Sequence, residues 1–186
     1  KRGGRAVVEA AKAKHGAERF WKDFIIAPVI PGHEFVGHVA ELGEGVTGFA
    51  IGDRVVSEQI VPCGKCRFCT TGRYWMCEVH DIYGFRDRVN GGMAEYMRLP
   101  ANARTFRIPR DMPIEKAILI EPFGCSKHAV DRADIGLEDI VVISGCGTLG
   151  LGMVGIARLK NPRLLIALDM QDNRLEKAKE FGADLV

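Results

Sequence analysis

The sequence has 186 residues, of which 47% are hydrophobic and 27% are charged, and its 26 basic and 24 acidic side chains leave a net charge of +2. This composition is ordinary for a globular protein of one or two domains. The charges are interspersed without a run of one sign, so nothing indicates binding to nucleic acid or to an anionic membrane surface. The most apolar stretch, residues 140–157, contains five glycines and fits a strand, a turn and a helix rather than a membrane span. The N-terminus lacks the basic and then apolar pattern of a signal peptide, so we expect a cytoplasmic protein whose thiols stay reduced.

The first half of the sequence predicts a β-rich domain over residues 30–110, made of short strands and glycine-containing turns. Before it, residues 6–14 predict a weak helix. The strands are predicted at residues 35–43, 54–61, 91–100 and 105–109. A loop region rich in cysteine separates the second and third of these strands.

Four of the six cysteines lie in the stretch "PCGKCRFCTTGRYWMC", at spacings of 3, 3 and 8 residues. Short C-x-x-C turns let thiolates face one point, and four sulfurs close the tetrahedral shell of a structural zinc ion. Disulfides, four unrelated thiols and a redox pair are weaker explanations in a chain of this class. A DNA-binding zinc module would need a basic patch and a helix for a groove, and the sequence shows neither. The predicted ligands are Cys63, Cys66, Cys69 and Cys77.

From Ile114 the pattern changes to a helical one. We expect one helix, a break at Pro122, and a second helix that ends near Gly136. Residues 139–186 then predict a strand, a glycine turn, a helix, a second strand, another helix and the start of a third strand.

The glycine turn reads "GCGTLG" and matches the G-x-G-x-x-G pattern of dinucleotide-binding proteins, between a strand and a helix as that pattern requires. Gly145 would permit the tight turn, Gly147 would let the backbone approach a pyrophosphate, and Gly150 would allow close packing. Asp169 ends the next strand, 19 residues after Gly150. A carboxylate there accepts hydrogen bonds from ribose hydroxyls and repels a 2′-phosphate, which favours NAD over NADP.

Two further segments carry possible ligands for a catalytic metal. "PGHEF" contains His33 and Glu34, and "IEPFG" contains Glu121. From these residues alone each assignment stays open, since a single histidine is more often a structural hydrogen-bonding group and a glutamate before proline can simply lie at a helix end.

The order of these motifs, together with "GGMAEY" at residues 91–96, resembles the zinc-dependent medium-chain alcohol dehydrogenases. Within that family the sequence is more similar to the polyol and threonine dehydrogenase branch than to the simple alcohol branch. The resemblance implies an α/β plus β fold: a GroES-like β-rich catalytic domain over residues 1–120, with the zinc lobe at 63–77, followed by a partial Rossmann domain over 121–186. A zinc-free reductase of the same superfamily is disfavoured, because such enzymes lack the cysteine lobe and the G-H-E motif.

The resemblance also implies a role for each motif. The four clustered cysteines would hold the structural zinc, and His33, Glu34 and Glu121 would serve the catalytic zinc. NAD would bind at Gly145, Gly147, Thr148, Leu149, Gly150 and Asp169. The expected reaction is transfer of a hydride from a secondary alcohol of a polyol, or from threonine, to NAD. The intact protein is expected to be a homo-oligomer.

Two departures from the family pattern shape these expectations. The family places a cysteine ligand of the catalytic zinc well upstream of the histidine, whereas this sequence has no cysteine before Cys63 and reads "VVEAAK" at residues 7–12. The sequence also ends after two strands of a sheet that needs about six. We therefore expect a fragment of a longer reading frame with an incomplete catalytic zinc site. The second hypothesis is a zinc-stabilised structural or interaction domain without catalytic activity.

Overall fold

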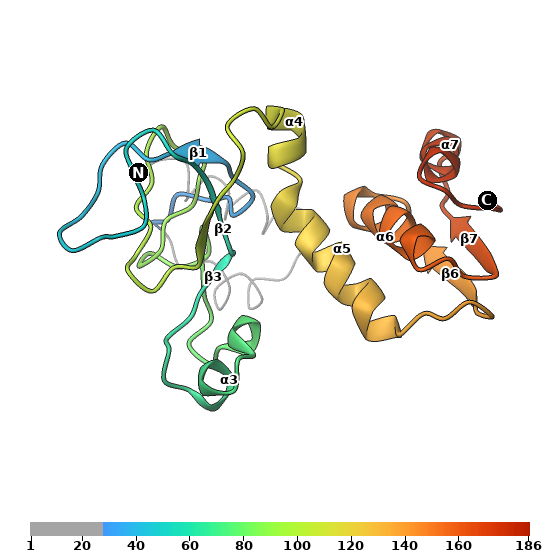
Figure 1. The fold of residues 1–186 in the computed structure, drawn as a ribbon, viewed down its shortest axis with the longest axis horizontal. Helices are drawn as coiled ribbons and strands as arrows, with labels where there is room; N and C mark the ends of the chain where they lie inside the picture. Colours follow the sequence, from blue (N-terminus) through green and yellow to red (C-terminus); the bar gives the residue numbers. More distant parts are fainter. Residues whose placement is uncertain (1–27) are drawn as a thin grey trace. The chain divides into compact units, whose positions relative to one another are not determined.

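A computed structural model describes residues 28–186, which fall into two compact units (Figure 1). The first unit ends at Ile118 and the second runs from Leu119 to Val186. Within this part of the chain, no helix is both long enough and apolar enough to cross a membrane. The helix predicted for residues 6–14 lies outside the described residues.

The first unit contains two small antiparallel sheets. Strands β1 (Gly37–His38), β2 (Arg54–Ser57) and β5 (Thr105–Arg107) form one sheet in the order β1-β2-β5. Strands β3 (Ile60–Val61) and β4 (Asp81–Ile82) form the other. In β2, Val55 pairs with Gly37 on one side and with Arg107 on the other.

The core of the first unit lies beside the second of these sheets. Its buried members are Val61, Tyr83 and Val89, and the half-buried Phe35 packs against them. The rings of Phe35 and Tyr83 meet edge to face, with their centroids 5.5 Å apart. This arrangement is one that aromatic pairs prefer, and it fixes the segment that follows His33 and Glu34.

Three strand predictions in the first unit need correction. Of residues 35–43 only Gly37–His38 form a strand. Residues 54–61 form two strands rather than one, because the backbone changes partners between them: Glu58 N–H bonds to Arg104, whereas the Gln59 carbonyl accepts from Tyr83. Residues 91–100 form no strand. Their apolar pattern instead supplies Met97 and Leu99 to the core, while Gly91 packs against the backbone of Pro31 and Gly32, and Gly92 packs against the Phe35 side chain.

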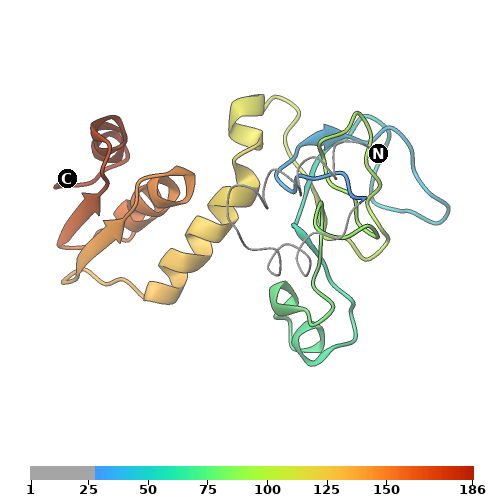
Figure 2. The ribbon, with the colours of Figure 1, turned by 180° about the vertical axis from the view of Figure 1, so that it is seen from behind.

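The second unit has the strand–helix–strand arrangement predicted from its sequence. Strands β6 (Ile140–Ser144) and β7 (Leu164–Leu168) are parallel, with Ile140 opposite Leu164 and Ser144 opposite Leu168. Helix α6 (Thr148–Leu159) connects them, and α7 (Asp172–Glu180) follows β7. Figure 2 shows the two strands side by side from behind. A parallel bridge between Ile166 and Leu185 begins the third strand of the predicted sheet.

The predicted helix break lies at a different place from Pro122. Helix α4 (Ile114–Ala117) ends the first unit, and α5 runs from Ile120 to Ala133 with Pro122 in its first turn. Proline is tolerated there because the first N–H groups of a helix have no intrahelical partner. At the other end, Asp134 adopts a left-handed conformation, with φ of 50°, which terminates the helix.

Truncation of Leu165 tests the core of the second unit. This side chain is fully buried on β7 among Ile143, Val154 and Ala167. We expect Leu165→Ala to lower the free energy of unfolding by about 2–5 kcal/mol through lost burial and the cavity left behind. Leu159→Ala is the matched control, because Leu159 is 83% exposed at the end of α6. Urea denaturation of both variants checks the prediction, and equal midpoints would contradict this core assignment.

Candidate metal and dinucleotide sites

The four clustered cysteines converge on one point in the first unit. Their sulfur atoms all lie within 4.8 Å of one another, and the sulfurs of Cys63 and Cys69 are 3.9 Å apart. A tetrahedral zinc ion with Zn–S bonds of about 2.3 Å places its sulfurs about 3.8 Å apart. None of these four cysteines forms a disulfide. The donor set and its spacing therefore fit a closed four-thiolate zinc site, as the sequence predicts.

Short local turns build this lobe. Helix α3 (Arg67–Thr70) begins directly after Cys66, and a single 3₁₀ turn, η1 (Tyr74–Met76), leads into Cys77. Neither element contains a buried residue. The surface of the lobe is held by a salt bridge of 2.9 Å between Arg67 and Glu78 and by Arg104, which lies 3.9 Å above the ring of Tyr74. These exposed contacts contribute little stability, so we infer that the structure of the lobe depends chiefly on a metal ion that joins its four sulfur atoms.

Backbone N–H groups prepare the sulfurs for a cation. Cys63 N–H donates to the sulfur of Cys77 at 3.3 Å, and Cys66 N–H donates to that of Cys63 at 3.4 Å. Backbone hydrogen bonds, first from Cys69 and then from Glu78, lower the pKa of Cys66 to about 6. Burial, and then the hydrogen bond with Cys66, raises the pKa of Cys69 to about 12. Despite the burial of Cys77, backbone hydrogen bonds from Cys63, His80 and Val79 also lower its pKa. The lobe therefore favours the thiolate form at Cys66 and Cys77, whereas a thiolate at Cys69 needs a positive ion beside it.

Close packing of backbone against backbone fixes the segment before His33. Gly91 N–H donates to Ile30 at 2.6 Å, Gly92 N–H donates to Gly32 at 2.9 Å, and Met93 N–H donates to Pro31 at 3.0 Å. A Cβ atom on Gly91 would overlap the carbonyl oxygens of Pro31 and Gly32. Gly32 itself has a φ of 97°, in the region that favours glycine. The "GG" of "GGMAEY" thus positions the residue that precedes His33, a role that the sequence did not reveal.

The residues predicted to serve a catalytic metal each lie within one of the two units. His33 and Glu34 follow Gly32 in the first unit, and the His33 ring lies 5.7 Å from that of Phe85, centroid to centroid. Glu121 belongs to the first turn of α5 in the second unit. Imidazole and carboxylate groups are ordinary zinc ligands, so the chemistry of the three side chains suits that ion. No cysteine of the described residues precedes Cys63.

The glycine turn has the backbone geometry that its pattern predicts. Gly145 has a φ of 93° and its N–H donates to Leu168 at 2.7 Å, which joins the turn to the end of β7. A Cβ atom on Gly150 would overlap the Gly145 carbonyl oxygen, so this position needs glycine for packing within the turn. A Cβ atom on Gly147 would meet nothing within 4 Å. The open space beside Gly147, at the N-terminus of a 12-residue helix, is where a phosphate would approach.

Asp169 closes the same turn with its carboxylate. Its Oδ2 accepts the N–H of Cys146 at 2.7 Å, and its Oδ1 accepts that of Gln171 at 3.0 Å. Arg174 lies 3.6 Å from Oδ2, and only 7% of the Asp169 side chain is exposed. The hydrogen bond from Cys146, followed by that from Gln171 and the charge of Arg174, holds the pKa of Asp169 below its ordinary value despite burial. The residue is therefore ionised at neutral pH and is both a candidate ribose acceptor and a structural part of the turn.

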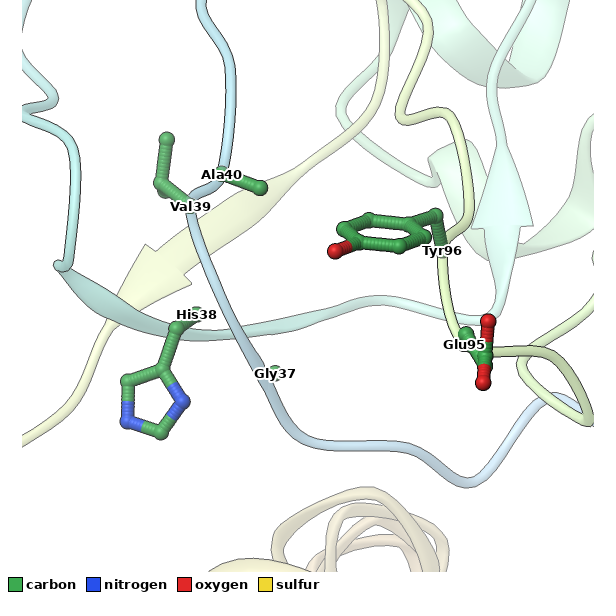
Figure 3. A pocket seen from close by; sticks show the side chains of 6 residues that line it. All are labelled: Gly37, His38, Val39, Ala40, Glu95 and Tyr96. Atoms are coloured by element: carbon green, nitrogen blue, oxygen red, sulfur yellow. The ribbon is translucent and has the colours of Figure 1, made fainter.

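A shallow hollow lies elsewhere on the first unit, lined by residues that carry no predicted role. Figure 3 shows the imidazole of His38 and the carboxylate of Glu95 on opposite sides of it, with the strongly exposed ring of Tyr96 on the same side as Glu95. Because its polar groups do not converge, the hollow offers no arrangement for catalysis. The remaining lining residues are Gly37, Val39 and Ala40.

The fold and these sites define a class of protein: a β-rich domain with a four-thiolate lobe, joined to the start of a dinucleotide-binding α/β unit. A model of the alcohol dehydrogenase GroES-like domain matches residues 8–110, more than half of the chain. The chain belongs to this family, which confirms the family and the fold class that the motifs predict.

Similar proteins carry the comparison further. The erythritol/L-threitol dehydrogenase of Mycolicibacterium smegmatis is 50% identical over an alignment of 182 residues that covers 94% of this chain and 50% of that protein. The L-threonine 3-dehydrogenase of Idiomarina loihiensis is 39% identical over 87% of this chain and 48% of its own length. A crystal structure from Escherichia coli CFT073, named as a short chain alcohol dehydrogenase complexed with NADH, is 34% identical over 84% of this chain and 46% of its own, with a TM-score of 0.77. The chain spans about half the length of the curated relatives it matches.

Zinc content tests the four-thiolate site. We expect about one tightly bound zinc ion per chain from the lobe, lost in Cys63→Ser and retained in the control Cys125→Ser, whose cysteine lies outside the cluster. Because the pKa of Cys66 is about 6, protons compete with the metal as the pH falls through that value. Since Cys69, with a pKa of about 12, already has to lose a proton to bind the metal at neutral pH, zinc affinity should decrease with falling pH across the neutral range. The decrease should become steeper below about pH 6, and a competition titration with a chelator at several pH values measures it. Retention of the metal by Cys63→Ser would contradict the assignment.

Proposed function

We propose that this chain is part of an NAD-dependent zinc dehydrogenase that transfers a hydride from a secondary alcohol of a polyol, or a similar small molecule, to NAD. The observation that carries the proposal is the presence in one chain of a four-thiolate lobe and of a glycine turn closed by the Asp169 carboxylate. The similarity to an erythritol/L-threitol dehydrogenase supports the polyol as substrate.

The chain's own residues would hold NAD at the start of α6. The open space beside Gly147 accommodates a pyrophosphate, and the N–H groups of the first helical turn, at Thr148 and Leu149, face it. Asp169 would accept the ribose hydroxyls. Its negative charge would repel a 2′-phosphate, which supports NAD rather than NADP.

A catalytic zinc would take His33, Glu34 and Glu121 as ligands or as groups near the ion. When bound, this metal supplies a Lewis acid for the oxidation of an alcohol. The segment before His33 supports this role, because its backbone is fixed by three hydrogen bonds to residues 91–93. A rigidly held ligand costs little ordering when the metal binds.

We further propose that the whole protein is a homo-oligomer in the cytoplasm. The oligomer follows from the resemblance to the polyol branch. The cytoplasm is supported by the four lobe cysteines, which form no disulfides and are suited to metal binding in their reduced form.

A specific observation favours a second function. The sequence has no cysteine before Cys63, so the thiolate that the family supplies to its catalytic zinc is missing from this chain. This favours a zinc-stabilised structural or interaction domain without turnover. For the proposed dehydrogenase, threonine is an alternative substrate, supported by the similarity to an L-threonine 3-dehydrogenase.

The assay that separates these functions is NADH formation by the protein that contains this chain. We expect activity with erythritol, threitol or sorbitol, and a loss of at least about 100-fold in Glu121→Gln, the scale on which a residue at the reacting centre acts. Glu115→Gln on α4 is the control. Activity only with threonine would show that threonine, and not a polyol, is the substrate. If no polyol, secondary alcohol or threonine yields NADH, the structural function is favoured.

Two glycine variants separate cofactor binding from folding. Gly147→Ala should leave the free energy of unfolding within about 0.5 kcal/mol of the parent, because its Cβ meets no atom within 4 Å and its φ is −74°. It should nevertheless abolish NADH binding by filling the space that a pyrophosphate needs. Gly150→Ala should instead lower stability by about 1–3 kcal/mol through overlap with Gly145. NADH fluorescence and thermal denaturation measure the two effects, and normal NADH binding by Gly147→Ala would exclude this turn as the cofactor site.

A further inference from the structure

Helices α5 and α6 of the second unit cross at an unusually close contact. Ser126 on α5 is fully buried, and its hydroxyl donates to the Leu149 carbonyl at 2.9 Å. Leu149 lies in the first turn of α6, within the G-x-G-x-x-G pattern. One hydrogen bond from α5 thus reaches the part of α6 that would bind the pyrophosphate.

The opposite side of this contact is Gly152. A Cβ atom at this position would lie 2.5 Å from the hydroxyl oxygen of Ser126, 3.0 Å from its Cβ and 3.1 Å from the Phe123 ring. No side chain larger than hydrogen fits without moving α5. Gly152 falls outside the G-x-G-x-x-G pattern, so dinucleotide recognition does not explain it.

A second contact holds the two helices together further along. Asp131 on α5 forms a salt bridge of 3.3 Å with Lys160, which follows the end of α6. Asp131 also pairs with Lys127 on its own helix. These groups are partly exposed, so they contribute less than the buried hydroxyl. Together, the two contacts fix both the position and the direction of α5 on α6.

Glu121 lies on the same helix, five residues before Ser126. Since an α-helix rises about 1.5 Å per residue, Glu121 is about 7.5 Å along the axis from the close contact. Over so short a distance a helix is stiff, and a displacement of Ser126 displaces Glu121 as well.

We propose that the contact between Ser126 and Gly152 is a positioning contact, which holds the helix that carries Glu121 in a fixed relation to the start of the dinucleotide-binding helix. Neither residue is among the proposed metal or cofactor ligands. This inference rests on the proposed function for the roles of Glu121 and of the glycine turn. Its consequence is that cofactor binding at α6 and the placement of Glu121 are linked within one unit.

An exchange of the two small residues tests the proposal. Gly152→Ala should push α5 away from α6, weaken NADH binding about tenfold and speed amide hydrogen exchange in α5 by a similar factor. Adding Ser126→Gly removes the two closest contacts of the new methyl group and leaves the one with the Phe123 ring at 3.1 Å, which a small shift of the ring relieves. The helix propensities of the two changes nearly cancel. The double variant should therefore recover most of the lost NADH affinity and amide protection. Gly124→Ala, on α5 with nothing within 4 Å of its Cβ, is the control.

The outcomes distinguish this proposal from the proposed function. Unchanged exchange in α5 and unchanged NADH affinity in Gly152→Ala would overturn the positioning contact. So would a double variant no closer to the parent than Gly152→Ala. If the parent chain binds no NADH, the cofactor assignment fails, and recovery of α5 protection in the double variant still decides whether the contact positions the helix.

Discussion

In both units the main chain packs directly against main chain, at positions where only glycine leaves room. In the first unit, the backbone of Pro31 and Gly32 lies against Gly84 and Gly91. In the second, the Gly145 carbonyl lies against Gly150. Each contact sets a segment from which function is proposed: the approach to His33 in one case and the glycine turn in the other. A contact between two backbones cannot be relaxed by a change of side-chain rotamer. A segment held in this way therefore has few alternative positions.

Much of the second unit could be predicted from its sequence, because its signals are local. The turn between β6 and α6 has three glycines at fixed offsets, and Asp169 follows directly after β7, where that pattern places an acidic residue. The four cysteines were equally predictable, since two C-x-x-C steps bring sulfurs together by local geometry.

The features that sequence reasoning missed depend on contacts between distant segments. The strand predicted at residues 91–100 is absent because Gly91 and Gly92 pair with residues 30–32 outside any regular sheet. Gly152 and Ser126 are in close contact between two helices, and neither helix's sequence pattern predicts that contact. The hydrogen bond from Cys146 to Asp169 likewise follows only from the folded turn. The helix break predicted at Pro122 is wrong for a local reason, because a proline in the first helical turn removes no hydrogen bond.

The absence of buried residues in α3 and η1 has a consequence for the chain entropy of the lobe. A hydrophobic core restrains a segment through many small contacts, whereas α3 and η1 bury no side chain and the strongest restraint on residues 63–77 would lie at their four sulfur atoms. Closing a loop of about 15 residues by a single cross-link removes about 3 kcal/mol of conformational freedom from the unfolded chain. A metal that joins these sulfurs is a cross-link of this kind, with the difference that a chelator or a proton can open it. The lobe can therefore be ordered or released by the surrounding solution, independently of the core beside it.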